Sequence, residues 1–292
     1  LKALEEILLH EYGEALGLKP IEEPVPVLMF RNYDMYKKYS GNLLAFAHFE
    51  PTTGRLAVHD SCDHTTILHE GTHQLMWAWT DRKGEMAANP ALRSYWFQEG
   101  IAEWYGGAHR ESKAGGGYEY QIGLLHDGRI QSIRESQGEG RSKLLFNLRE
   151  LLNLRYADRP RVEKTFRVGQ MYAQAWFLIY FMNHFDVDAE GYVVIGKPGR
   201  YAAKWTKYVK AELTGETGLD AFMRIMELDD AALDRMEDEY WRYFTWIRRK
   251  INFGHIQEKR VVAWNDFVNK KGEKTGERAD DLLPEYDKVD VP

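Results

Sequence analysis

The sequence predicts an α+β fold, with a small mixed β-sheet near the N-terminus and a mainly helical remainder. Two observations lead to this prediction. Apolar and alternating runs typical of strands are confined to residues 25–60. Helical spacing of apolar residues dominates from Asp63 to about residue 250. There is no internal repeat, and strands followed by helices favour α+β architecture.

The expected elements follow in chain order. Residues 1–18 have helical spacing that ends near Gly17 and Pro20. VPVLMFRN (25–32) has the pattern of a buried strand, and a short helix is expected over 34–41. Residues 43–60 predict two strands around a turn at 51–54. The later helices are expected at 63–79, 92–105, 144–154, 168–185, 200–213, 218–226 and 230–250.

These elements divide the chain into one main domain with two extensions. The N-terminal helix and a linker occupy residues 1–24, and the main domain covers 25–255. Within it, the sheet and first helices span 25–110, and a helical subdomain spans 140–255. Residues 256–292 are polar and are expected to be partly flexible.

Composition limits the possible partners. The chain has 292 residues and a net charge of -6, which gives no reason to expect nucleic-acid binding. It contains no apolar run long enough to span a membrane. Cys62 is the single cysteine, so no intrachain disulfide can form. The chain starts at Leu1 without a signal peptide, as after removal of a leader or trimming. Export to the periplasm or cell exterior is the expectation, while the compartment and oligomeric state stay open.

The first candidate site lies on a helix with two histidines. TILHEGTHQL (66–75) contains His-Glu-x-x-His, with His69 and His73 one turn apart on the same face. Two imidazoles so spaced can reach one ion at about 2.0–2.1 Å each. Glu70 projects beside such an ion, where it can accept a proton from water. Asp63 is the expected N-cap. Two surface histidines with an accidental glutamate between them are the alternative.

Two glutamates on the next helix strengthen the metal interpretation. A catalytic zinc needs a third protein ligand and an open position. YWFQEGIAEWYGG (95–107) places Glu99 and Glu103 four residues apart on one helix face. One carboxylate can bind the ion, and the other can accept the second ring N–H of a ligating histidine. A solvated helix face, the alternative, fits poorly with the surrounding aromatic and apolar residues.

His69-Glu-Gly-Thr-His73 followed by WFQEGIAEWY resembles the gluzincin group of zinc metallopeptidases, the peptidase-MA-like clan of thermolysin-like and aminopeptidase-like enzymes. More narrowly, MYAQAWFLIYF (171–181) and the segment 221–244 resemble an uncharacterised bacterial branch of that clan. Strong motifs cover 69–105, and the weaker likeness covers about 43–246. The resemblance implies a zincin-like fold, with a gluzincin-like catalytic domain over 25–255.

The resemblance also implies roles for individual residues. His69, His73 and Glu99 would bind one Zn²⁺ ion, Glu70 would act as general base, and Glu103 would support a ligating histidine. Enzymes of this group use a tyrosine or histidine of the helical subdomain to stabilise the oxyanion. Tyr172 is the first candidate here.

Tyr180 and His184 are weaker candidates for the oxyanion donor, and a role in the core or at the rim is the alternative for every tyrosine. The remaining histidines near the motif, His48, His59 and His64, are expected to be structural, and Cys62 to be an inert thiol. In the resembled group an edge strand binds extended peptide, and GRLAVHD (54–60) is the expected edge strand.

The expected function is therefore hydrolysis of peptide bonds by a zinc-dependent metallopeptidase, with a peptide or protein as substrate. One alternative is a catalytically silent module of the same fold that binds peptide or polymer. Another is a metal-dependent amidase that acts on a non-peptide bond. Aminopeptidase action is not favoured, because no Gly-x-Met-x-Asn-type motif precedes the histidine helix.

Overall fold

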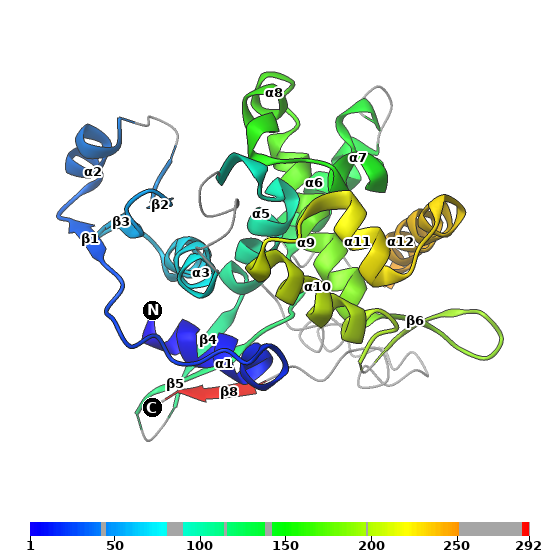
Figure 1. The fold of residues 1–292 in the computed structure, drawn as a ribbon, viewed down its shortest axis with the longest axis horizontal. Helices are drawn as coiled ribbons and strands as arrows, with labels where there is room; N and C mark the ends of the chain where they lie inside the picture. Colours follow the sequence, from blue (N-terminus) through cyan, green and yellow to red (C-terminus); the bar gives the residue numbers. More distant parts are fainter. Residues whose placement is uncertain are drawn as a thin grey trace, which may run out of the picture.

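The computed structural model of the chain has a small N-terminal sheet beside a larger helical body (Figure 1). It describes residues 1–41, 45–80, 90–113, 116–137, 142–196, 198–250 and 288–291. The fold is mixed α+β, with small sheets and a helical C-terminal region, as the sequence predicts. No helix within these described segments has the length and apolar character needed to cross a membrane.

The elements have the following bounds. The α-helices are α1 (Lys2–Leu16), α2 (Tyr33–Ser40), α3 (His64–Trp79), α5 (Tyr95–Gly106), α6 (Asp127–Ser136), α7 (Leu148–Leu152), α8 (Arg159–Lys164), α9 (Val168–His184), α10 (Ala202–Thr214), α11 (Gly218–Met226) and α12 (Asp230–Lys250). The 3₁₀ turns are η1 (Pro90–Leu92), η2 (Ser142–Leu144) and η3 (Tyr156–Asp158). The strands are β1 (Val27–Phe30), β2 (His48–Glu50), β3 (Arg55–His59), β4 (His109–Ser112), β5 (Tyr118–Gln121), β6 (Phe185–Val187), β7 (Val193–Ile195) and β8 (Lys288–Val291).

The N-terminal sheet has the strand order β1-β3-β2. Strand β1 runs parallel to β3, while β2 is antiparallel to it. The expectation that residues 54–60 form the edge strand is therefore wrong, since β3 lies at the centre of the sheet. The buried side chains Leu56, Ala57 and Val58 explain this position, because a central strand is covered on both faces. The edge strand on the cleft side is β2.

Helix α3 is tied to this sheet by polar contacts as well as by packing. Its N-cap is Asp63, as expected, whose side chain accepts from Thr66 N at 2.8 Å. The buried Gln74 amide donates at 2.9 Å to the carbonyl oxygens of both Pro26 and Gly54. Because a buried amide needs its partners, these bonds fix how α3 lies against the sheet.

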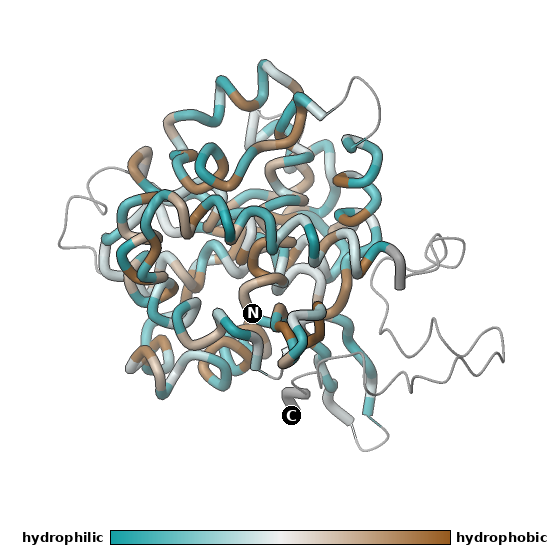
Figure 2. Tube along the Cα trace, turned by 90° about the vertical axis from the view of Figure 1, so that its right-hand side faces the viewer, coloured by the Kyte–Doolittle hydropathy of each residue, from teal (hydrophilic) through white to brown (hydrophobic). Residues whose placement is uncertain are grey.

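Helices α5 and α9 form the centre of the helical body. Every residue of α5 is buried, and α9 is buried over most of its length. The two helices approach so closely that a Cβ on Gly100 would lie 3.0 Å from the backbone carbonyl of Ala175. In Figure 2 hydrophobic and hydrophilic residues alternate along the helical tubes, as in amphipathic helices around a shared core. The largest side chains of this core include Trp96, Trp176, Trp205, Tyr208, Tyr240 and Tyr243.

Several elements differ from the sequence prediction. The hairpin β4–β5, helix α6 and the hairpin β6–β7 are additional elements. Strand β4 was not predictable from alternation, because most of its side chains are exposed. The helix expected over 144–154 is shorter and follows the turn η2. Residues 251–287, most of the expected extension, lie outside the described residues, whereas β8 pairs antiparallel with β5.

Candidate metal centre

The structure brings His69, His73 and Glu99 together between α3 and α5. One ligand atom from each residue lies within 4.8 Å of the others. Oε2 of Glu99 is 3.4 Å from Nε2 of His69 and 3.4 Å from Nε2 of His73. Within the described residues, these three side chains are the group of His, Cys, Asp or Glu residues whose ligand atoms lie close enough together to hold a metal ion. The spacing of the motifs predicted His69 and His73 but left the third position open between Glu99 and Glu103, and the family resemblance assigned it to Glu99.

The three side chains fit a divalent cation. Oε2 of Glu99 is buried and has no hydrogen-bond partner, although it faces both imidazoles. Burial acts to raise the pKa of Glu99, but His73 and His69 outweigh it and lower this pKa well below its usual range. Burial acts to lower the pKa of His69, yet Glu103 and Glu99 raise it to about 10. Two buried carboxylates at His69 thus favour a positive charge here, which a metal ion would supply.

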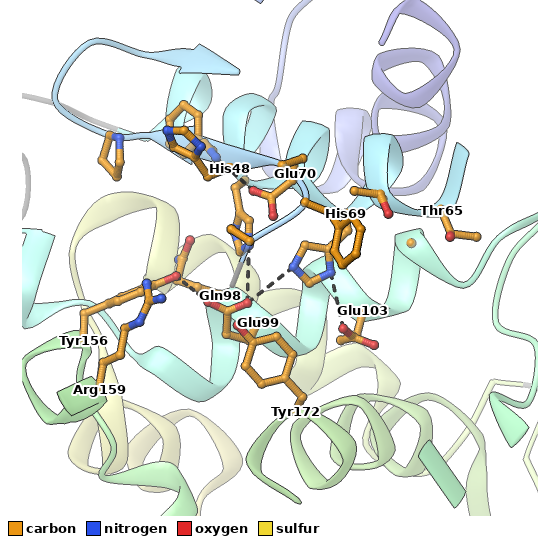
Figure 3. Close-up of a pocket in the computed structure, with 18 of the residues that line it drawn as sticks. His48, Thr65, His69, Glu70, Gln98, Glu99, Glu103, Tyr156, Arg159 and Tyr172 are labelled. Atoms are coloured by element: carbon orange, nitrogen blue, oxygen red, sulfur yellow. Dashed lines mark hydrogen bonds and ion pairs between the residues drawn. The ribbon is translucent and has the colours of Figure 1, made fainter. Parts of the chain in front are cut away.

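Glu103 holds His69 from the opposite side. Its Oε1 lies 3.4 Å from Nδ1 of His69, as Figure 3 shows. Arg129, on α6, binds the same carboxylate through two hydrogen bonds of 2.7 and 2.6 Å. Burial acts to raise the pKa of Glu103, but Arg129 and His69 lower it to about 2. Glu103 therefore lies beside the ring nitrogen of His69 that faces away from Glu99. Arg129 was missed because nothing in its local sequence marks it.

Tyr156 is a second contact that sequence reasoning missed. Its hydroxyl donates to Oε1 of Glu99 at 2.7 Å (Figure 3). Burial, followed by the charge of Glu99, raises the pKa of Tyr156 well above its usual range, so the phenol remains a donor. One oxygen of Glu99 therefore accepts a hydrogen bond from Tyr156, and the other oxygen faces the two histidines.

Glu70 lies on the β2 side of this cluster (Figure 3). Its Oε2 accepts a hydrogen bond from the backbone N–H of Phe49 at 2.9 Å. This amide belongs to the edge strand β2, so the sheet fixes the carboxylate beside the two histidines of its own helix. The position suits a group that receives and returns a proton.

Tyr172 lines the cleft, and its ring lies parallel to that of His69 with centroids 6.2 Å apart. Burial, followed by the charge of Glu99, raises the pKa of Tyr172 well above its usual range. Tyr180 and His184, the weaker candidates, do not line the cleft and instead pack against Trp104. Among the candidates from α9, Tyr172 is thus the one that lines the cleft.

The other residues considered from sequence lie outside the metal cluster. His48 lines the cleft, but its Nδ1 is 2.9 Å from the hydroxyl of Tyr36. His59 is buried in the sheet region, and His64 is exposed on the first turn of α3. Burial raises the pKa of the Cys62 thiol, which suits an inert side chain.

The cluster opens into a cleft of about 1140 Å³. Its walls come from β2 and the preceding residues, from α3 and α5, and from the segments around His126, Tyr156 and Tyr172. This volume is slightly above the range of about 300–1,000 Å³ that is typical of ligand pockets.

Comparison with known proteins adds a family similarity. Residues 63–195 match a family described as "protein of unknown function" (DUF1570). This segment is less than half of the chain, and it contains α3, α5 and α9 with the metal cluster, Glu70 and Tyr172. No curated protein and no solved structure matches the chain.

Proposed function

We propose that this protein is a zinc-dependent metallopeptidase of the gluzincin type, with a zincin-like catalytic unit. The observation that carries the proposal is the buried Oε2 of Glu99, which lacks a hydrogen-bond partner and lies 3.4 Å from both imidazoles. Two histidines and one carboxylate are a ligand set of catalytic zinc sites. A bound zinc ion would supply Lewis-acid polarisation of the substrate carbonyl and activation of water.

The chain's own residues would divide the remaining work. Glu70, held by the N–H of Phe49, takes a proton from the attacking water and later delivers it to the leaving amine nitrogen. Tyr172, with its pKa raised by burial, donates to the oxyanion that develops on the carbonyl oxygen. The edge strand β2 runs along the cleft and offers backbone groups to an extended peptide.

Metal content is the first test. We expect about one zinc per chain in the purified protein and its loss in His73→Ala. His64→Ala is the matched control, because His64 lies on the same helix but outside the cluster. A parent chain with less than about half an equivalent of zinc, unchanged by His73→Ala, would refute the metal site.

Hydrolysis is the second test. Glu70→Gln should retain zinc and lose cleavage of a broad peptide library, since the amide cannot accept the proton. A zinc-loaded parent that binds peptides without cleaving any would instead support a silent binding module. Cleavage of amide bonds only in non-peptide compounds would support an amidase.

A further inference from the structure

One end of the cleft carries polar groups that the proposed reaction does not use. Figure 3 shows Gln98 and Arg159 on the same side of the cluster as Tyr156, away from Thr65 and Glu103. Both side chains line the cleft.

Arg159 is the first residue of α8, and its orientation is fixed by one contact. Its Nε donates to Oε1 of Glu163 at 2.8 Å, one helical turn further on. Neither Nη1 nor Nη2 donates to another residue in the described part of the chain. The guanidinium is therefore anchored at one edge, while the side chain lines the cleft and is 48% exposed. The Nη1 and Nη2 groups of Arg159 can each donate a hydrogen bond to one oxygen of a carboxylate.

Gln98 supplies a second group at the same end. The residue is 8% exposed, and its side-chain amide makes no hydrogen bond to any residue that the structure describes. This amide lines the cleft and offers one acceptor and two donor hydrogens to a bound molecule.

Two arginines contribute to this end of the cleft. Arg93 and Arg159 both line the cleft, and Arg93 is bonded through its backbone carbonyl to the N–H of Tyr156. Of the described acids that line this end, Glu163 is paired with Arg159, and Glu99 accepts a hydrogen bond from Tyr156. Glu99 would be neutralised by the ion.

We infer that Arg159 and Gln98 form a subsite for a substrate carboxylate, so that the enzyme prefers peptides with an acidic group beside the bond it cleaves. This inference rests on the proposed peptidase function. The carboxylate belongs either to an Asp or Glu side chain or to the C-terminus of the peptide. Both kinds of carboxylate offer two oxygens to the two Nη groups of Arg159.

The test uses the zinc-loaded protein and matched peptides. Each pair differs by Glu or Gln at one position near the cleaved bond, and each peptide is made with a free or an amidated C-terminus. We expect the acidic member to be cleaved about 10-fold or more efficiently, mainly through a lower KM, as for a charge-assisted hydrogen bond. Side-chain dependence identifies Asp or Glu as the source, and dependence on amidation identifies the C-terminus.

Two variants test the assignment. Arg159→Gln should reduce the preference to about 2-fold or less while cleavage of the uncharged member is retained, and Gln98→Leu should weaken the preference about 5-fold. Arg161→Gln is the control, because Arg161 lies on the same helix, pairs with Asp158 and does not line the cleft. A preference that persists in Arg159→Gln, or a parent that cleaves peptides without any preference, overturns the inference.

A binding measurement separates this inference from the proposed function. Fluorescein-labelled heptapeptides with a central Glu or Gln are titrated with the zinc-loaded protein, and fluorescence polarisation is followed. If no peptide is cleaved, the peptidase proposal fails, but a Glu preference that Arg159→Gln abolishes still supports the subsite. Equal binding of the two peptides refutes it.

Discussion

Replacing Tyr156 by phenylalanine tests how the carboxylate ligand is held. The change removes the hydroxyl that donates to Oε1 of Glu99 at 2.7 Å and leaves the rest of the ring in place. A hydrogen bond to a charged group contributes about 1.5–3 kcal/mol, which equals about 12–150-fold in an equilibrium constant. Partners of metal ligands typically change metal affinity by about 10–100-fold, so the two magnitudes agree. We expect zinc binding in Tyr156→Phe to be weaker by about 10–100-fold.

The affinity is best measured by competition with a chromophoric chelator at fixed pH. A shift in the visible spectrum of the cobalt-substituted protein would show that the ligand field itself changes. Tyr243→Phe is the matched control, because it removes a buried hydroxyl from α12, in the aromatic core away from the cleft. If Tyr156→Phe binds zinc within about twofold of the parent and its cobalt spectrum is unchanged, Tyr156 does not position Glu99.

Three further predictions concern stability, each measured by urea unfolding. Arg129→Met leaves the buried Glu103 without its bidentate partner and should lower the free energy of unfolding by about 3 kcal/mol, the lower end for a buried pair because Arg129 is 28% exposed. Adding Glu103→Gln should recover part of this loss. Purely additive effects of the two substitutions would contradict the pairing. Gly100→Ala should cost about 1–3 kcal/mol, since its Cβ would meet the α9 backbone at 3.0 Å, whereas Gly169→Ala, with no atom within 4 Å, should be neutral. Burial lowers the pKa of His184 to about 3 in the folded chain. His184 therefore binds a proton below about pH 6.5 in the unfolded chain, but only below about pH 3 in the folded chain. Stability should therefore fall with decreasing pH across this window by up to about 1.4 kcal/mol per unit from this residue, and an unchanged slope in His184→Gln would show that His184 is not responsible.

The parts of the site that could be predicted from the sequence are those set by local geometry. His69 and His73 share a face because they are one helical turn apart, and the same spacing places Glu99 and Glu103 together. The boundaries of α3, at His64–Trp79, follow from the Asp63 cap and the apolar periodicity.

The remaining parts depend on contacts between distant segments. Tyr156 lies 57 residues from Glu99 in the chain, and Arg129 lies 26 residues from Glu103. No helix or turn was predicted at either position, and the local sequence does not indicate which acid either side chain contacts. The edge strand was misassigned for the same reason, because strand order is decided by pairing across the sheet and not by the pattern within β3.

Because the cluster is divided between two helices, the proposed metal ion would contribute to the stability of the fold. His69 and His73 come from α3, which is bonded to the sheet, whereas Glu99 comes from α5 in the middle of the helical body. An ion bound by both helices would act as a removable cross-link between the sheet side and the helical body. Free zinc at about 100 times its Kd would raise the free energy of unfolding by about 2.7 kcal/mol. The thermal midpoint should therefore rise with zinc concentration, and the apoprotein should be the form that proteases attack first.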